Sequence, residues 1–225
     1  MRKITGLQIG LFFALLGIIL GLGIGTTALL LGGLALGDFR GVTLVAVAVV
    51  FIYLYAFAVF RLFLKVAPLH AGEVQLGSRQ EFVYHVYLLF FLMVFYPVMR
   101  AGFIPVPLMR LVYLALGARL GRNTYSGGLI LDPPFVQAGD NTLIGQGAMI
   151  IPHAIEGESL SHHPVRIGSN VTIGANAVIL QGVTIGDGAV VAVGAVVRKG
   201  AKIGPGEVWG GVPAKRLQDR GESGG

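Results

Sequence analysis

Histidines and carboxylates gather in one short stretch of this 225-residue sequence. His153, His162 and His163 lie close together, and Glu156 and Glu158 stand between them. A neutral imidazole can take the proton of a hydroxyl or amine as that group attacks an acyl carbonyl. A carboxylate beside it can orient the ring and stabilise the imidazolium. The stretch therefore predicts a general base at one of these histidines, oriented by Glu156 or Glu158, unless all three are solvated loop residues.

Metal chemistry is a weaker interpretation of the same cluster. The sequence has no cysteine, which excludes disulfides and thiolate metal sites. A zinc site of the γ-carbonic anhydrase kind needs three histidines that converge from different coils. His153, His162 and His163 lack two ligands at the five-residue offset typical of that site. We therefore expect no metal.

The cluster lies inside a repeat of six residues that starts at Leu120. The first position of the later hexads is β-branched: Ile167, Ile173, Ile179, Ile185, Val191, Val197 and Ile203. The fifth position is nearly always small or apolar, and glycine is frequent at the second. A period of six fits neither a helix nor a simple strand alternation. It predicts a prism in which each hexad is a short strand plus a corner and three hexads close one turn. Parallel strands of successive turns would stack about 4.8 Å apart.

The repeat is interrupted once in this hexad frame, at residues 156–160. His153 occupies the fourth position of the preceding hexad, which points outward at a corner. Most residues of a repeat serve its own core, so we expect function to lie where the pattern breaks.

The hexads from Ile167 to Val190, followed by Trp209-Gly-Gly-Val-Pro-Ala-Lys-Arg216, resemble the hexapeptide-repeat acyltransferase superfamily. The resemblance covers residues 120–217. It implies an all-β, left-handed parallel β-helix, a homotrimer with active sites between subunits, and acetyl-CoA or another acyl-CoA as donor, or else an acyl carrier protein. His153 matches the place of the family's general base. His163, in His-His-Pro, resembles a histidine of serine acetyltransferases.

The resemblance also implies where the donor binds. Ala175, Val193 and Gly194 match the groove of the pantetheine arm, although Val193 replaces a smaller residue. Basic positions near the nucleotide phosphates are matched by Arg198, Lys199, Lys215 and Arg216; the alternative for these cations is a solvated face. Trp209 is expected to cap the core. The acceptor motif matches only loosely at Asn123-Thr-Tyr125, and residues 132–135 could either reach the acceptor pocket or form a corner.

The N-terminal half predicts membrane helices. Leu7 to Gly37 and Val42 to Phe60 contain no charged residue, and about 20 apolar residues suffice to span a bilayer. Together they predict a transmembrane hairpin. Gly17, Gly21 and Gly25 share one helix face, where another anchor could pack closely, although glycine is common in membrane helices.

A third apolar stretch, Phe82 to Met99, is near the lower length limit of a span. Basic residues flank both ends of the hairpin, and positive residues mark the cytoplasmic side. An even number of crossings follows, so we interpret this stretch as re-entrant or interfacial. Prolines and Gly117 frame a short helix from Ile104. The expected domains are therefore a hairpin at 1–70, a connecting region at 71–119, a β-helix at 120–217 and a flexible tail at 218–225.

These features favour a membrane-anchored acyltransferase, typically an O-acetyltransferase, with its β-helix on the cytoplasmic side of the inner membrane. The anchor points to a membrane-proximal or lipid-linked acceptor such as a saccharide. The alternatives are an N-acyltransferase, an enzyme that uses acyl carrier protein, and a non-catalytic trimeric scaffold. The net charge is +6, but the basic residues are scattered and many flank apolar segments, so no nucleic-acid partner is expected.

Overall fold

The structure of the protein is a computed structural model that describes residues 3–219. It forms two compact units that alternate along the chain. One contains residues 70–80 and 97–219 and is built on a β-helix. The other contains residues 3–69 and 81–96 and is helical. The connecting region expected at 71–119 is thus divided between the two units.

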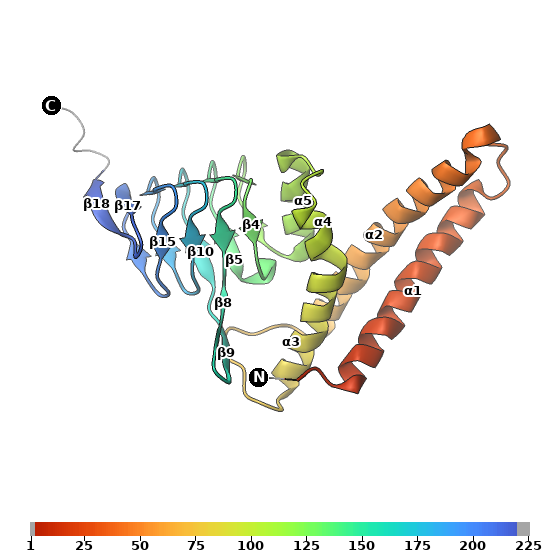
Figure 1. Cartoon of the computed structure of the whole chain (residues 1–225), viewed down its shortest axis with the longest axis horizontal. Coiled ribbons are helices and arrows are strands. Elements are labelled where there is room, and N and C mark those ends of the chain that lie inside the picture. Colours follow the sequence, from red (N-terminus) through yellow and green to blue (C-terminus); the bar gives the residue numbers. More distant parts are fainter. Residues whose placement is uncertain (1–2, 220–225) are drawn as a thin grey trace. The chain divides into compact units, whose positions relative to one another are not determined.

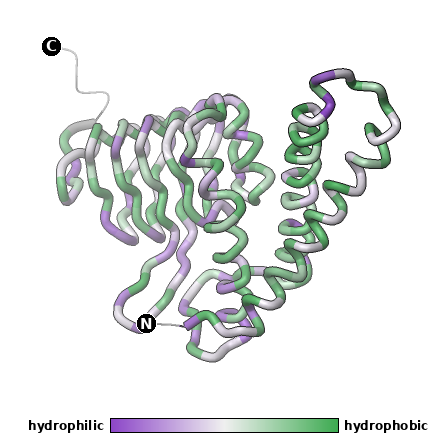
Figure 2. Tube along the Cα trace, turned by 45° about the vertical axis from the view of Figure 1, so that its right-hand side comes forward, coloured by the Kyte–Doolittle hydropathy of each residue, from purple (hydrophilic) through white to green (hydrophobic). Residues whose placement is uncertain are grey.

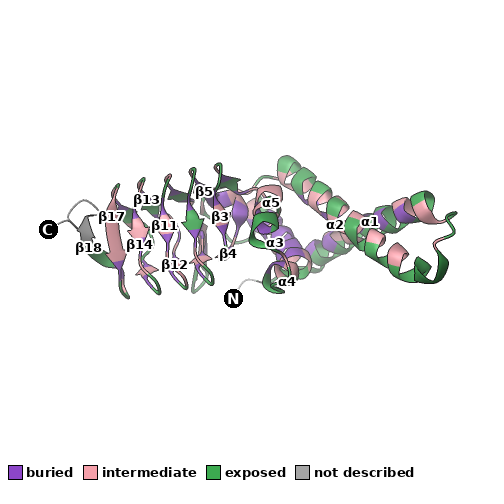
Figure 3. Ribbon diagram, turned by 90° about the horizontal axis from the view of Figure 1, so that it is seen from above, coloured by how far each residue is buried: buried purple, intermediate pink, exposed green. Residues whose placement is uncertain are grey.

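The β-helix is a prism with three faces, and each face is a sheet of parallel strands (Figures 1 and 3). Face 1 consists of β2 (Arg119–Leu120), β5 (Val136–Ala138), β10 (Val165–Ile167), β13 (Thr184–Ile185) and β16 (Lys202–Ile203). Face 2 consists of β3 (Tyr125–Ser126), β6 (Leu143–Ile144), β11 (Thr172–Ile173), β14 (Val190–Val191) and β17 (Glu207–Gly210), closed by antiparallel β18 (Lys215–Asp219). Face 3 consists of β4 (Leu129–Ile130), β7 (Met149–Ile150), β12 (Val178–Ile179) and β15 (Val196–Val197). The chain visits the faces in turn, an arrangement typical of a left-handed β-helix.

The hexad pattern explains why this prism packs. First-position residues such as Ile173, Ile179 and Val197 are fully buried and stack in register from coil to coil. Second-position glycines sit where coils approach most closely. A Cβ at Gly174 would lie 2.5 Å from the Val193 backbone nitrogen, so any larger residue would push two coils apart.

The hexad frame fails in the first coil. Ile130, and not Asp132, lies in register with Ile150. The step from Ser126 to Ile130 is therefore shorter than a hexad, and the step from Ile130 to Ala138 is longer. The expectation of a single interruption was wrong. The extra residues form a short 3-10 turn, η3 (Pro133–Phe135), because two consecutive prolines cannot continue the strand ladder.

The second departure from the prism is a hairpin of β8 (His153–Glu156) and β9 (Ser159–His162) (Figure 1). A third antiparallel strand, β1 (Gly72–Glu73), pairs with β9. The helix α5 (Val106–Leu116) packs at the first coil. Pro105 precedes it, and Gly117 ends it with a φ of 109°, a left-handed conformation that favours glycine. The prediction of this short helix is confirmed.

The residues of the helical unit are mostly hydrophobic (Figure 2). It contains α1 (Gly6–Leu31), the turn η1 (Gly37–Phe39), α2 (Arg40–Val66), most of α3 (Arg79–Phe90) and the π-helical η2 (Phe91–Phe95), which leads into α4 (Tyr96–Arg100). Three helical runs in the described residues are long and apolar enough to cross a membrane: Gly6–Leu31, Gly37–Val66 and Arg79–Arg100. The two helices of the predicted hairpin are confirmed as helices. The third run is continuous, and its re-entrant placement stays a prediction.

Helix α1 packs against α2 at Gly23, which is not one of the three glycines predicted to share a packing face. Gly23 meets Ile52 of α2 so closely that an added Cβ would lie 2.5 Å from the side chain of Ile52. Gly17, Gly21 and Gly25 have no atom that close, so their packing against another anchor remains a prediction. At the other end of the chain, Gln218 and Asp219 of the expected tail belong to β18; residues 220–225 lie outside the described residues.

Candidate active site

The candidate site lies along the edge where the chain passes from face 3 to face 1, here called the polar corner. Asp132 lies there in the first coil, the β8–β9 hairpin leaves the prism there in the second, and Gln181 and Lys199 follow in the third and fourth. Coil stacking therefore collects in one column residues that are far apart in the sequence.

Asp132 contacts His153 directly at the root of the hairpin. The Asp132 side chain is almost completely buried, and its backbone has a φ of 42° just before Pro133. Its Oδ2 lies within hydrogen-bonding distance of the His153 Nδ1. An ionised carboxylate can only accept, so Nδ1 carries the proton and Nε2 keeps its lone pair. The His153 side chain is 25% exposed, which leaves the ring accessible to a substrate.

Burial and charge act in opposite directions on His153. Burial lowers the pKa of this imidazole, but the hydrogen bond from Nδ1 and the negative charge of Asp132 outweigh it. The net result is a raised pKa. Such a group can receive a proton near neutral pH and hold it as a stabilised imidazolium.

His162 lies opposite His153 across the hairpin and is buried. Its ring stacks on Phe135 at a centroid distance of 5.0 Å and lies 6.4 Å from the His153 ring. Burial lowers the pKa of His162 to about 4, and the nearby His153 and His163 act in the same direction against the charge of Asp132. His162 therefore stays neutral, and its packed ring supports the pair of Asp132 and His153, here called the dyad.

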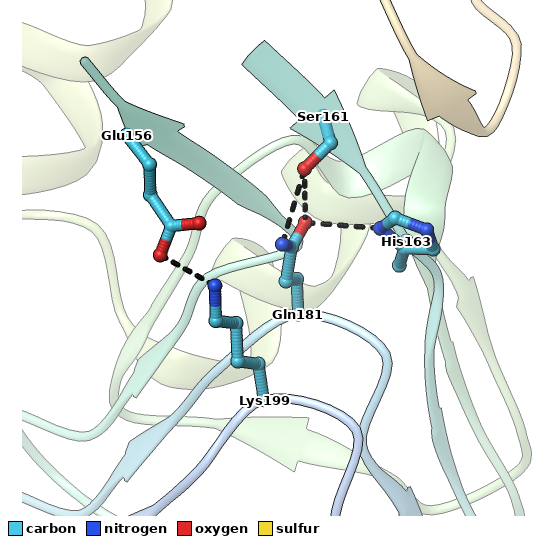
Figure 4. A network of polar contacts seen from close by, with 5 residues as sticks. All are labelled: Glu156, Ser161, His163, Gln181 and Lys199. Carbon is cyan, nitrogen blue, oxygen red and sulfur yellow. Dashed lines mark hydrogen bonds and ion pairs between the residues drawn. The ribbon is translucent and has the colours of Figure 1, made fainter. Parts of the chain in front are cut away.

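A second polar network contains Ser161, His163 and Gln181 (Figure 4). The Gln181 Oε1 lies 3.2 Å from the His163 Nδ1 and accepts a hydrogen bond from the Ser161 hydroxyl at 3.3 Å. The Gln181 Nε2 donates to the Ser161 Oγ at 3.1 Å. The exposed His163 is thus oriented by an uncharged amide. It lacks the carboxylate partner that His153 has in Asp132.

The predicted role of Glu156 in orienting the ring was wrong. Glu156 lies at the far end of β8 and pairs with Lys199 from the fourth coil (Figure 4). Both side chains are largely solvent-exposed, and Glu158 belongs to the turn beyond β8. Residues of a strand advance about 3.3 Å each and alternate between its two faces, so Glu156 lies about 10 Å further along β8 than His153 and on the opposite face. Asp132 fills the role instead.

The predicted donor residues form two groups. Ala175, Val193 and Gly194 stack on the edge between faces 2 and 3, where the Gly194 N–H donates to the Ala175 carbonyl at 2.9 Å. Val193 is 73% exposed. This edge differs from the polar corner, so a single prism does not bring these residues to His153.

The second group surrounds a pocket of about 340 Å³ near the last coil. Its lining includes Arg198, Lys215, Arg216 and Trp209, but not Lys199. Trp209 lies in register with the core residue Val191, as expected of a cap, and its Nε1 donates to the Glu207 carboxylate at 2.8 Å. The pKa of Glu207 is lowered by the Gly204 N–H, then by the Trp209 indole, with a smaller contribution from Arg216. Within residues 3–219, no three side chains gather as metal ligands.

Sequence reasoning named Asp132 only within residues 132–135, as a corner or a contact to the acceptor pocket, and missed it as the partner of His153. It did not single out Gln181 at all. Continuing the hexads strictly placed Asp132 at an inward first position, where a carboxylate would be buried without a partner. That conflict, next to two prolines, was the available signal that the frame had shifted. Gln181 carried no such signal, because a glutamine at a corner position is ordinary.

Comparison with known families identifies the repeat itself. Residues 164–199 match the model described as the hexapeptide repeat of succinyl-transferase. No curated protein matches the chain.

Several solved structures are similar to part of this chain. A hexapeptide-repeat-containing acetyltransferase from Vibrio cholerae is 31% identical, with a TM-score of 0.42, over 46% of this chain and 63% of its own. Its complex with acetyl coenzyme A has a TM-score of 0.43 at the same identity and covers 60% of that chain. A galactoside acetyltransferase in complex with coenzyme A is 32% identical, with a TM-score of 0.41, over 46% of this chain and 56% of its own. This chain thus spans roughly 60% of the length of these structures.

Proposed function

We propose that the protein is a membrane-anchored acyltransferase that moves an acetyl or similar acyl group from coenzyme A to a hydroxyl of a membrane-proximal acceptor. The observation that carries this proposal is the pair of Asp132 and His153 at the root of the hairpin. A buried carboxylate that fixes the imidazole tautomer is what a general base requires.

The chemical step follows from this geometry. The His153 Nε2 takes the proton of the acceptor hydroxyl as its oxygen attacks the thioester carbonyl. Asp132 stabilises the imidazolium that forms. When the tetrahedral intermediate collapses, the carbon–sulfur bond breaks, and the departing sulfur takes the proton from His153. The products are an acyl ester and free coenzyme A, and the base returns to its starting state.

Donor binding is proposed at the cationic pocket and at the edge between faces 2 and 3. Arg198, Lys215 and Arg216 supply charges suited to phosphate groups. The residues that we propose for the pantetheine groove, Ala175, Val193 and Gly194, lie on a different edge of the same prism from His153. The proposal therefore includes a neighbouring copy that completes the site, as in a homotrimer with sites between subunits.

The anchor supports an acceptor at the membrane, such as a lipid-linked saccharide, because confinement to the bilayer raises the encounter frequency. The positive-inside pattern supports placement of the β-helix on the cytoplasmic side. An amine acceptor or an acyl carrier protein as donor would use the same base. A non-catalytic scaffold would not need a buried carboxylate aimed at a histidine.

The test is thiol release from acetyl-CoA by the full chain in detergent, with a panel of monosaccharide and lipid-linked acceptors. Acceptor-dependent release that disappears in His153→Asn supports the proposal. If coenzyme A fails to bind in calorimetry and no acceptor stimulates release, the scaffold is the better interpretation.

A further inference from the structure

The hairpin that carries His153 has little support of its own. Strands β8 and β9 leave the prism, and Ile155 near its end is 65% exposed. An isolated two-stranded hairpin is at best marginally stable in water. The position of the base nevertheless depends on this hairpin, because His153 begins β8 and His162 ends β9 in register with it.

A third strand supplies the missing support, and it comes from a distant part of the chain. Gly72 and Glu73 pair with His162 and Ser161 in antiparallel register. The Val74 N–H donates to the Leu160 carbonyl at 2.8 Å, and the side chains of Val74 and Leu160 are both buried. Strand β1 thus covers the edge of β9 that faces away from β8.

The origin of β1 sets it apart from the rest of this unit. It lies in the short connection between α2, which ends at Val66, and α3, which begins at Arg79. Both of these helices belong to runs that are long and apolar enough to cross a membrane. A strand tethered at both ends pairs intramolecularly, and therefore at high effective concentration.

We propose that β1 is a positioning element of the active site, through which the connection between the membrane helices fixes the catalytic hairpin. The backbone of β1 holds β9, and β9 holds the His162 ring against Phe135 and beside His153. The direction of the His153 Nε2 is thereby set. This inference rests on the proposed acyl transfer, because it concerns the base of that reaction.

The decisive variant is Val74→Pro. Proline removes the N–H that bonds to the Leu160 carbonyl and favours an extended residue before it, as β1 already has. Leu76→Pro is the matched control. Leu76 is exposed and is the second residue of a turn in which the Ser78 N–H donates to the Gln75 carbonyl. The next residue, Gly77, has a positive φ, and proline is favoured at the position before it in such a turn. Val74→Ala keeps the N–H and tests the side chain alone.

The readouts are kcat and the KM for acetyl-CoA of the full chain in detergent, with an acceptor that supports wild-type turnover. We expect Val74→Pro to lower kcat by about tenfold or more, since small displacements of a catalytic group are costly. The KM for acetyl-CoA should stay within about twofold, because the donor residues lie on other parts of the prism. Leu76→Pro should retain wild-type kinetics, and Val74→Ala should lie between. Equal kcat in Val74→Pro and Leu76→Pro would overturn the proposal.

Hydrogen exchange gives a readout independent of turnover. In Val74→Pro, amides of residues 153–162 should exchange faster while those of the coils from residue 167 onward stay protected. If wild type transfers no acyl group, the proposed function fails, but this exchange pattern still tests the support given by β1. Unchanged exchange in the hairpin, or uniform loss of protection across the prism, would count against it.

Discussion

Two edges of one prism use aspartate in opposite ways. On the edge between faces 1 and 2, Asp140 and Asp187 are exposed, and each accepts a backbone N–H of the preceding coil, from Arg122 and Ser169, at 2.7 Å. At the polar corner, Asp132 is buried and faces a histidine side chain. The first two aspartates hold coils together. Asp132 instead places its negative charge beside the titratable ring of His153.

The difference follows from the local backbone, which is a regular repeated turn at Asp140 and Asp187 but not at Asp132. Asp140 and Asp187 follow glycine in regular hexads, where each closes a repeated turn. Asp132 lies in the step from face 3 to face 1, which is longer than a hexad in the first coil, and the hairpin of the next coil brings His153 to it. At the first break in the repeat, the Asp132 carboxylate does not bond to the backbone of a neighbouring coil in the described part of the chain. At the second break, the hairpin brings His153 to it.

The largest expected effect is that of His153→Asn. Loss of the general base should lower kcat by about 1000-fold, within the usual contribution of such a group. The matched control is His163→Asn, at the other histidine of the cluster that retains solvent access. It should cost far less, because Gln181 offers His163 no charge. Steady-state kinetics decide, and a greater loss in His163→Asn would move the base to that residue.

Asp132→Asn comes next. The amide can still contact the ring, but it neither fixes the tautomer nor stabilises an imidazolium, so kcat should fall by about 10- to 100-fold. The KM for acetyl-CoA should change little. Near-normal kcat in a folded Asp132→Asn protein would show that the dyad is only a packing contact.

Asp140→Ala tests the structural edge. It should lower the free energy of unfolding by about 1 kcal/mol, the usual net value of one hydrogen bond, and leave kcat unchanged. Denaturant unfolding and steady-state kinetics together check this. A large loss of kcat at unchanged stability would contradict the contrast between the two edges.

Glu156→Gln should have the smallest effect. The pair of Glu156 with Lys199 is solvent-exposed, and such pairs contribute about 0–1 kcal/mol. Turnover within about twofold of wild type is expected at moderate salt. A loss as large as that of Asp132→Asn would restore Glu156 as the partner of the base.

The sequence predicted the prism because its core obeys one local rule. Each β-branched first position indicates a buried site and each second-position glycine indicates a close approach of two coils. The same pattern recurs in every regular coil. The dyad depends on two departures from that rule in successive coils, and a shifted frame hides where Asp132 points. The pairing of β1 with β9 joins segments from different halves of the chain, and a two-residue strand leaves no pattern in the sequence.

The most direct measurement is the pH dependence of kcat/KM for wild type and Asp132→Asn. The base must be neutral, so kcat/KM falls as pH drops through the pKa of His153. Because Asp132 raises that pKa above its usual value of 6.5, the wild-type acid limb should lie above pH 6.5. Without the carboxylate, burial alone acts on the ring, and the limb should move to lower pH as the rate falls. An acid limb at the same pH in both proteins would contradict the dyad.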